Sequence, residues 1–523
     1  MKILNAFYDL KVSPCTFDIV YFLFAAEMYR RHLSLDAIDL FVVANDEGDG
    51  FRIETVDTTI EAKEWMLQHV LLQCHTLLKS CRRTIHCPSR EEAQKHIDGM
   101  DPVYPANYSV TTPHPNYTAP EIVVQGLRGY PYSTLSATSE ALNKVDLWTS
   151  SQDVEDRRLI CITLREMDRR PKRNSDLKAW STFARSLDPD VYFPVIVRDT
   201  ATVFRPPPNE LQGLACFDAA ALDIQIRMAL YERAFLNLLV NNGPIALLYF
   251  NEKTRYLQFR PQYDEADTSE RYLAKIGFTA DYDPMLKTRY QKVSMDFDKI
   301  ENIDREFNRM MANTKSAPPT QFDQWASANE WRKRFARFGS FDVAEQIHQI
   351  ICTKAGKNEH EDTEFDLLVA QSASALAEEG YHLDAERGFD LLAKRAPENI
   401  EFRFGRLKVL TQLFKIDEII AELEHLEGLG ADMSPLNSLK AQCLTQVGRY
   451  EEAVDYFDKH FAMHVPDPNT LFDYSNAVGA IGDINAQIGA LERALLLLSP
   501  NDKDAIAKIE AALEIARDAQ TVS

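Results

Sequence analysis

A run of cations between residues 164 and 175 is the part of the sequence best suited to chemistry. Arg165 directly follows an apolar stretch that predicts a buried strand at 159–164, and Arg173 comes just before Asn174, where a helix is expected to begin. Open α/β sheets bind ligands at the carboxyl ends of their strands, and a helix N-terminus beside cations attracts anions. The run therefore predicts an anion site, and a solvated loop is the alternative interpretation.

Two further segments suggest contacts to the same ligand. Arg198 follows the next predicted strand, and a surface pair with Asp199 is the alternative to a ligand contact. Asn242 and Gly243 form a sharp turn after a predicted helix at 222–239. Backbone N–H groups in such a turn can hold a phosphate, but Asn and Gly are also the usual residues at the C-terminus of a helix. Both interpretations of the turn stay open at this point.

Carboxylates near the N-terminus are candidate proton acceptors. Asp9 ends a predicted strand at 2–9, and Asp18 precedes a predicted helix at 19–32. A carboxylate in this loop can act as a general base, with Asp18 the first candidate and Asp9 the second. A helix cap is the alternative role for Asp18. The sequence has no zinc-ligand spacing, Walker loop, Gly-x-Gly-x-x-Gly or Gly-x-Ser-x-Gly motif, so we expect neither a metal nor a bound cofactor.

The elements that must position these residues alternate between strand and helix on both sides of a Pro-rich stretch at 98–134. The first series comprises strands at 2–9, 38–44 and 83–87 and helices at 19–32, 60–79 and 90–97. The second comprises strands at 159–164, 192–197 and 256–259 and helices at 175–187 and 222–239. Such alternation predicts parallel sheets. We expect two α/β halves, 1–135 and 136–315, facing each other across a cleft, with 121–124 as one additional strand.

The last third of the chain contains a repeat. A Gly or Phe at 380, 414, 448 and 482 is followed five residues later by a small, apolar or amide side chain and nine residues later by a bulky one. The 34-residue period is that of a tetratricopeptide array, so we expect at least four antiparallel helix pairs within 325–515. A fifth copy begins at Gly339, and an insertion at 354–364 separates it from the others. Helices are also expected at 297–335, with a break at Pro318-Pro319. Such arrays are mostly interaction surfaces, which predicts a protein partner.

Composition narrows the range of partners and compartments. The chain has 523 residues and a formal net charge of −21, which argues against nucleic-acid binding because phosphate neutralisation supplies most of that affinity. The most apolar stretch, 19–26, is too short to span a bilayer, and the N-terminus does not resemble a signal peptide. Eight scattered cysteines are typical of reduced thiols. We expect a cytoplasmic protein without a transmembrane segment.

The two α/β halves resemble the B-type glycosyltransferases, in which two Rossmann-like halves bind a nucleotide-sugar donor and an acceptor. Residues 162–166 together with 173–175 resemble the strand-then-arginine donor motif of fucosyltransferase-type members, although Leu164 and Glu166 flank the arginine differently. Residues 192–199 are similar to their next strand, and residues 242–244 to a Gly-Pro turn near the donor phosphate in bacterial members. Bacterial glycosyltransferases fused to tetratricopeptide arrays are a familiar arrangement.

The resemblance implies an α/β plus all-α fold: an acceptor-side half at 1–135, a donor-side half at 136–315, and a repeat solenoid at 325–515. It implies a metal-independent hexosyl- or fucosyltransferase-like enzyme that moves a sugar from a nucleotide-sugar to a glycan or protein. Arg165, Arg173, Arg198, Asn242 and Gly243 would bind the donor, and Asp18 or Asp9 would take the acceptor proton. The alternatives are a non-enzymatic scaffold with a degenerate α/β module, and another nucleotide-using α/β enzyme such as an epimerase.

Overall fold

The computed structural model divides the chain into two compact units. One contains Met1–Phe335 and Val343–Lys354, and the other contains Ala336–Asp342 and Ala355–Ser523. The structure describes residues 1–53, 58–99, 102–113, 120–130, 134–152, 154, 156–168, 170–251, 253–261, 263, 269–275, 290–314 and 328–522. The expected helix break at Pro318-Pro319 lies outside these residues. No helix in the described ranges has both the length and the apolar character needed to cross a membrane.

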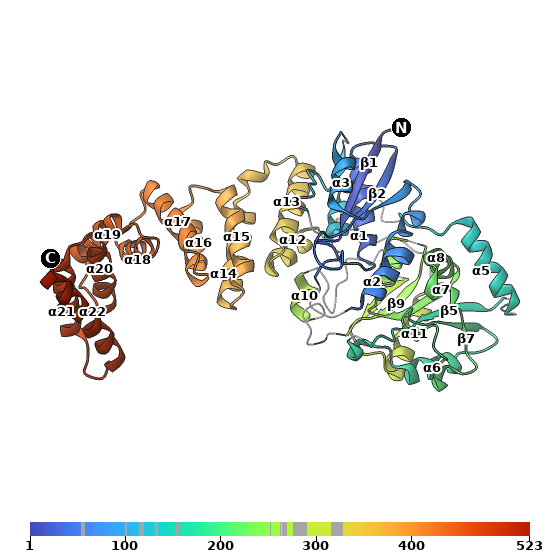
Figure 1. Ribbon diagram of the computed structural model, residues 1–523. Helices are drawn as coiled ribbons and strands as arrows, with labels where there is room; N and C mark the ends of the chain where they lie inside the picture. The colour runs from blue at the N-terminus through green and yellow to red at the C-terminus, as the bar shows by residue number, and fades with distance from the viewer. Residues whose placement is uncertain are drawn as a thin grey trace. The chain divides into compact units, whose positions relative to one another are not determined.

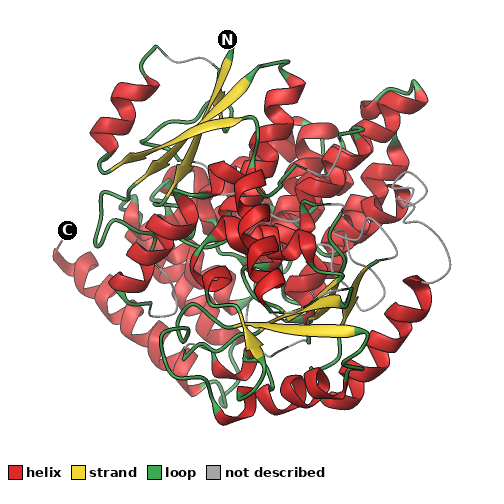
Figure 2. Ribbon diagram, turned by 90° about the vertical axis from the view of Figure 1, so that its right-hand side faces the viewer, coloured by secondary structure: helices red, strands yellow, loops and turns green. Residues whose placement is uncertain are grey.

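The first unit contains two separate parallel sheets (Figure 2). The N-terminal sheet has the order β3-β2-β1-β4 and consists of β1 (Ile3–Asp9), β2 (Ala37–Val43), β3 (Cys81–Cys87) and β4 (Val103–Tyr104). The central strands β1 and β2 are almost wholly buried, as expected for parallel strands covered on both faces.

The helices around this sheet largely follow the sequence prediction. They are α1 (Ile19–His32), α2 (Ile60–Met66), η1 (Leu67–Leu71), η2 (Cys74–Leu77), α3 (Arg90–Ile97) and α4 (Pro120–Leu127). The expected strand at 121–124 is wrong, because these residues lie within α4. Pro120 provides the reason, since proline is well tolerated in the first turn of a helix.

The second sheet has the order β10-β9-β8-β5-β6-β7, and every neighbouring pair is parallel. Its strands are β5 (Arg158–Thr163), β6 (Tyr192–Val197), β7 (Ala215–Cys216), β8 (Leu236–Val240), β9 (Tyr256–Phe259) and β10 (Gln291–Ser294). When the six strands are numbered 1 to 6 in chain order and the sheet is read from β7 to β10, the order is 3-2-1-4-5-6, that of a doubly wound sheet. The direction of winding reverses between β5 and β8, and such a reversal point is where open α/β sheets bind ligands.

The helices of this half vary in length from single turns to 15 residues in α11. They are α5 (Ser139–Ser151), which packs against α8, η3 (Pro171–Arg173), α6 (Leu177–Ser186), η4 (Asn209–Leu211), α7 (Ala219–Leu222), α8 (Ile224–Arg233), α9 (Ile245–Tyr249), α10 (Glu270–Lys275) and α11 (Ile300–Thr314). The single long helix expected at 222–239 is wrong, because α8 ends at Arg233 and the next residues form β8. The run Leu236–Val240 pairs with β5 on one side and β9 on the other, so sheet pairing decides its conformation.

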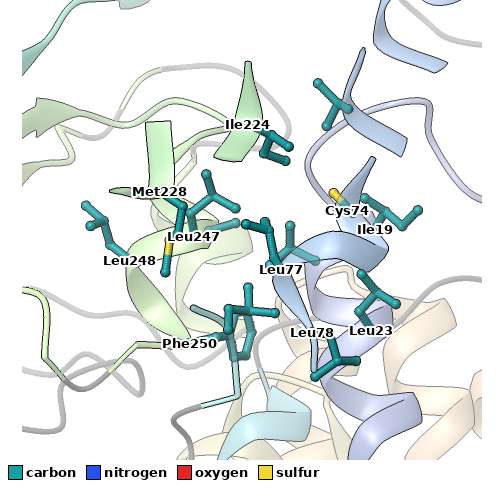
Figure 3. Close-up of a cluster of buried hydrophobic side chains, with 14 of the residues drawn as sticks. Ile19, Leu23, Cys74, Leu77, Leu78, Ile224, Met228, Leu247, Leu248 and Phe250 are labelled. Carbon is teal, nitrogen blue, oxygen red and sulfur yellow. The ribbon is translucent and has the colours of Figure 1, made fainter. Parts of the chain in front are cut away.

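An apolar layer joins the two sheets into one unit (Figure 3). From the N-terminal half, α1 contributes Ile19 and Leu23, and η2 contributes Leu77. From the second half, α8 contributes Met228 and α9 contributes Leu247. Each of these side chains is almost completely buried. The halves therefore share a core at this contact, and the cleft between them stays a prediction.

The described residues from 328 onward are mainly helical (Figure 1). Two helices, α12 (Ala328–Arg337) and α13 (Phe341–Ala355), precede a short turn η6 (Glu359–Glu361). Four helix pairs follow: α14 (Thr363–Glu378) with α15 (His382–Arg395), α16 (Ile400–Gln412) with α17 (Ile416–Gly428), α18 (Asn437–Gln446) with α19 (Tyr450–Met463), and α20 (Pro468–Ala480) with α21 (Ile484–Leu497). The last described helix is α22 (Lys503–Val522). The expected tetratricopeptide array is thus confirmed.

The 34-residue period corresponds to the turn inside each pair. Gly380, Gly448 and Gly482 adopt φ angles of 86°, 79° and 88°, which favour glycine. Phe414 occupies the same place in the second pair with φ 54°, and its side chain is 83% exposed. Gly339 has φ 84° between α12 and α13, so the fifth sequence copy forms the same kind of turn.

Small residues elsewhere in the repeat allow helices to pack closely. Ala385 and Ala453 are fully buried in the second helices of their pairs. A Cβ atom built on Gly405 would overlap the Phe389 ring, so a larger residue fits only if that ring moves. The repeat positions are therefore packing positions, as their spacing predicts.

The left-handed turn at Phe414 gives a stability prediction. We expect Phe414→Gly to stabilise the array by about 0.5–1 kcal/mol, because relief of the left-handed conformation exceeds the entropy lost by glycine and little buried surface is lost. Far-UV circular dichroism during heating measures the shift. Gly448→Ala is the matched control and should destabilise by about 1 kcal/mol. A lower melting temperature for Phe414→Gly would contradict this account of the turn.

Candidate functional site

Arginines follow three strands of the second sheet at its carboxyl edge. Arg165 lies beyond the end of β5, Arg198 follows β6, and Arg260 follows β9. All three are buried. Because these strands are parallel, their carboxyl ends meet at the same edge of the sheet. A buried guanidinium needs nearby acceptors, so the partners of each arginine decide what it can do.

Arg165 braces the loop that follows β5. Its Nη1 donates to the Asn174 Oδ1 at 2.6 Å and to the Arg170 carbonyl oxygen at 3.0 Å. Its backbone N–H donates to the Ser175 Oγ at 2.9 Å, and the Ser175 N–H donates back to the Arg165 carbonyl oxygen. Asn174 also bonds both backbone groups of Met167. The guanidinium therefore holds the basic loop in a fixed shape.

Arg198 is neutralised by a carboxylate of the neighbouring strand end. Its Nε and Nη2 donate to the two oxygens of Glu166 at 3.2 and 3.1 Å, and its Nη1 donates to the Arg205 carbonyl oxygen. Glu166 also accepts from the Asp199 N–H and the Thr202 hydroxyl. The alternative interpretation, a surface pair between Arg198 and Asp199, is wrong, because the carboxylate that binds Arg198 belongs to Glu166.

Arg173 and the turn after β8 lie together. The Arg173 Nη2 donates to the Asn241 carbonyl oxygen at 3.5 Å. Asn242 and Gly243 follow directly, and the turn comes after a strand rather than a helix, so the helix C-terminus alternative for these residues is wrong. Arg173 and the turn follow β5 and β8, the two strands between which the winding reverses. Arg198 lies one strand farther along the edge.

Sequence reasoning missed Arg260, which joins the turn to the next strand end. Its Nη2 donates to the Gln258 Oε1 at 3.1 Å and contacts the Tyr249 hydroxyl. The Gln258 Nε2 donates to the Asn241 Oδ1 at 3.3 Å, and the Tyr249 hydroxyl donates to the Gln258 Oε1 at 2.6 Å. A signal was present, because Arg260 follows the predicted strand at 256–259 much as Arg165 follows 159–164.

Asp9 is a fully engaged buried carboxylate at the end of β1. Arg90 donates to its two oxygens at 3.1 and 3.0 Å, the Tyr108 hydroxyl donates at 2.5 Å, and the Lys11 N–H donates at 2.9 Å. Burial, followed by the charge of Asp9, raises the pKa of Tyr108 well above its usual range. These donors orient Asp9 and occupy its oxygens, which suits a structural role.

Asp18 lies directly before α1 in the neighbouring loop. Its side chain makes no capping hydrogen bond to the helix backbone but accepts from the Thr16 hydroxyl instead. Burial, and after it the charge of Asp18, raises the pKa of Tyr8 well above 10. Asp18 therefore does not form the side-chain hydrogen bond that defines a helix cap.

A contact between Phe17 and Gly243 joins the two loops. A Cβ atom built on Gly243 would lie 2.7 Å from the Phe17 Cδ2 and 3.3 Å from its Cγ. The loop that carries Asp18 in the first half therefore touches the turn that Arg173 contacts in the second half. The structure thereby brings the Asp18 loop, the Asn242-Gly243 turn and Arg173 into one region, whereas Asp9 and Arg198 are tied to other partners.

This contact can be tested by a double-mutant cycle. Gly243→Ala should destabilise the first unit by about 1–3 kcal/mol, because the new methyl group must displace the Phe17 ring. Combined with Phe17→Leu, the same change should cost at least 0.5 kcal/mol less, because the two residues are coupled. Chemical denaturation of the four proteins measures the coupling. Strictly additive losses would mean that the two side chains do not meet.

Neither a protein-family model nor a curated protein matches the sequence. Three solved structures illustrate its likeness to known folds, which falls on the helical repeats. A MamA protein shares 13% identity over 30% of this chain and 82% of its own, with a TM-score of 0.27. MamA 41-end from Desulfovibrio magneticus RS-1 shares 14% sequence identity over 30% of this chain and 91% of its own, with a TM-score of 0.26. YrrB, a TPR protein with an unusual peptide-binding site, shares 11% sequence identity over 35% of this chain and 90% of its own, with a TM-score of 0.27. The helices and turns of the chain itself identify the array.

Proposed function

We propose that this chain is a protein-binding scaffold whose repeat array holds a partner protein. The observation that carries the proposal is the layer formed by the first helices of the pairs, in which two neighbouring couples are in direct contact. These helices pack directly against each other, α14 against α16 and α18 against α20. Stacked repeats of this kind form extended binding surfaces that no single repeat provides.

Exposed apolar side chains on the first helices suit the capture of a peptide or helix. Leu367 on α14 is 54% exposed, and Phe404 on α16 is 37% exposed. Covering such side chains with a partner removes apolar surface from water, which favours binding. A partner segment with its own apolar anchors is therefore the expected ligand.

Ion pairs between helices keep this layer in place before a partner arrives. Glu422 on α17 accepts from Arg403 and Arg406 of α16, and Arg406 also bonds Asp390 of α15. The Lys415 Nζ, in the next turn, lies 2.6 Å from Glu386 of α15. A surface that is already ordered loses less entropy when it binds.

A peptide selection with matched variants tests the scaffold. Peptides selected against the full chain should bind Leu367→Glu and Phe404→Glu at least tenfold more weakly in calorimetric titrations, a loss of about 1.4 kcal/mol or more. Leu383→Glu is the control, because Leu383 is 64% exposed but belongs to the second helix α15. Equal affinity for all three variants, or no selected peptide, would refute binding at the first helices.

A second candidate function is transfer of a sugar from a nucleotide-sugar to a glycan or protein acceptor. It is supported by the contact of Arg173 with the turn at the strand ends where the second sheet reverses its winding. A cation beside backbone N–H groups suits a diphosphate and could stabilise the leaving nucleotide without a metal. In this proposal the two halves act as the donor and acceptor sides of a B-type glycosyltransferase.

The roles differ among the proposed site residues. Arg173 and the backbone of Asn242 and Gly243 would contact the diphosphate. Arg165 and Arg198 would keep the loops around it in place. Asp18 would take the acceptor proton, and Asp9 is second because Arg90 and Tyr108 already occupy its oxygens.

Nucleotide binding by paired variants tests this candidate. Arg173→Ala should weaken binding of nucleoside diphosphates at least tenfold and of the corresponding nucleosides less than twofold, because the lost contact is to phosphate. Lys172→Ala removes the same charge from an exposed neighbour and should change both by less than twofold. A panel of uridine, guanosine and cytidine diphosphates in thermal-shift titrations provides the measurement. Loss of nucleoside and diphosphate binding alike would indicate a folding defect and contradict the phosphate contact.

A further inference from the structure

An open surface groove lies between α21 and α22 in the repeat unit. Its volume is about 770 Å³. Its apolar lining comes from Leu495 and Leu496 of α21 and Leu513 of α22. Leu496 is 85% exposed, although it lies among helices whose other leucines are mostly covered. The groove lies on different helices from Leu367 and Phe404, so it is separate from the first-helix surface proposed above.

One side of the groove is strongly acidic. Glu510, Glu514 and Asp518 follow each other at intervals of four residues on α22, so they form one line along the helix. The one cation in the lining, Arg517, donates to Glu492 of α21 at 2.7 Å. Within the described residues, none of the three carboxylates in the line forms an ion pair.

This arrangement disfavours a second copy of the chain as the occupant. Two copies meeting through this groove would place the same line of carboxylates face to face, and like charges at close range repel. The chain as a whole carries a formal net charge of −21, which adds to the repulsion. A partner with the opposite charge gains from both the line of carboxylates and the exposed leucine.

We propose that the groove between α21 and α22 binds a basic amphipathic helix of another protein. The line from Glu510 to Asp518 covers eight residue steps, or about 12 Å at 1.5 Å per residue, which matches two turns of a bound helix. Leucines at intervals of three and four residues on the partner enter the groove and cover Leu496. Lysines or arginines spaced four apart beside them face the three carboxylates.

Titration of the full chain with a labelled peptide tests the proposal. The probe is a 16-residue helical peptide with leucines on one face and lysines spaced four apart along its border, read by fluorescence anisotropy at 0.15 M salt. Leu496→Asp should weaken binding at least tenfold, with an unchanged melting curve because the side chain is already exposed. The triple variant Glu510→Lys, Glu514→Lys and Asp518→Lys should weaken it at least tenfold as well.

A charge-matched control distinguishes binding at the groove from nonspecific attraction of a basic peptide to an acidic protein. Glu401→Lys, Glu451→Lys and Asp455→Lys change the net charge equally at exposed positions of α16 and α19. This control should bind the probe within twofold of the unaltered protein. Equal weakening by both triple variants would overturn the proposal, as would equal binding of a peptide with glutamates in place of the lysines.

Self-association of the chain through the groove is the remaining outcome that the test must distinguish. A dimer in sedimentation equilibrium that dissociates in Leu496→Asp would identify a second copy as the occupant and overturn the proposal. The scaffold test uses Leu367 and Phe404, and this test uses Leu496 and the α22 carboxylates. Failure of one is therefore distinguishable from failure of the other.

Discussion

The arrangement of the first unit depends on the burial of one apolar layer between its two sheets. Leu23 and Leu77 from one half meet Met228 and Leu247 from the other, and the unfolded chain would expose all four to water. Burying such a side chain contributes roughly 1.5–3 kcal/mol. The same layer fixes the loop before α1 next to the turn after β8. Packing of the core therefore determines the geometry of the candidate site.

The elements predicted from the sequence were those with a strong local signal. Strands β1, β2, β5 and β6 are mostly apolar, and each begins and ends within about one residue of its predicted position. The strand β8 was hidden because Leu236–Val240 follows a helix without a glycine or proline between them. Only pairing with β5 and β9 separates the two elements, and no local pattern contains that information.

The site was predictable to a similar degree. The principle that ligand contacts follow parallel strands directed attention to the residues after β5 and β6, whereas the turn after β8 was expected to follow a helix. It could not say which arginines bond to the protein itself. Glu166 neutralises Arg198, and Asn174 binds Arg165, through contacts between segments whose distance in space the sequence does not reveal. Arg173, by contrast, contacts the Asn241 carbonyl at the winding reversal.

The shared core also sets how the first unit can lose its structure. Because α1 and α9 bury their apolar faces in the same layer, separating the halves exposes both faces at once. Neither sheet then keeps a complete hydrophobic covering, and each half alone has the exposed surface of an aggregation-prone intermediate. The two halves therefore form one cooperative folding unit despite having two sheets. Either half expressed without the other would lack part of its own interior.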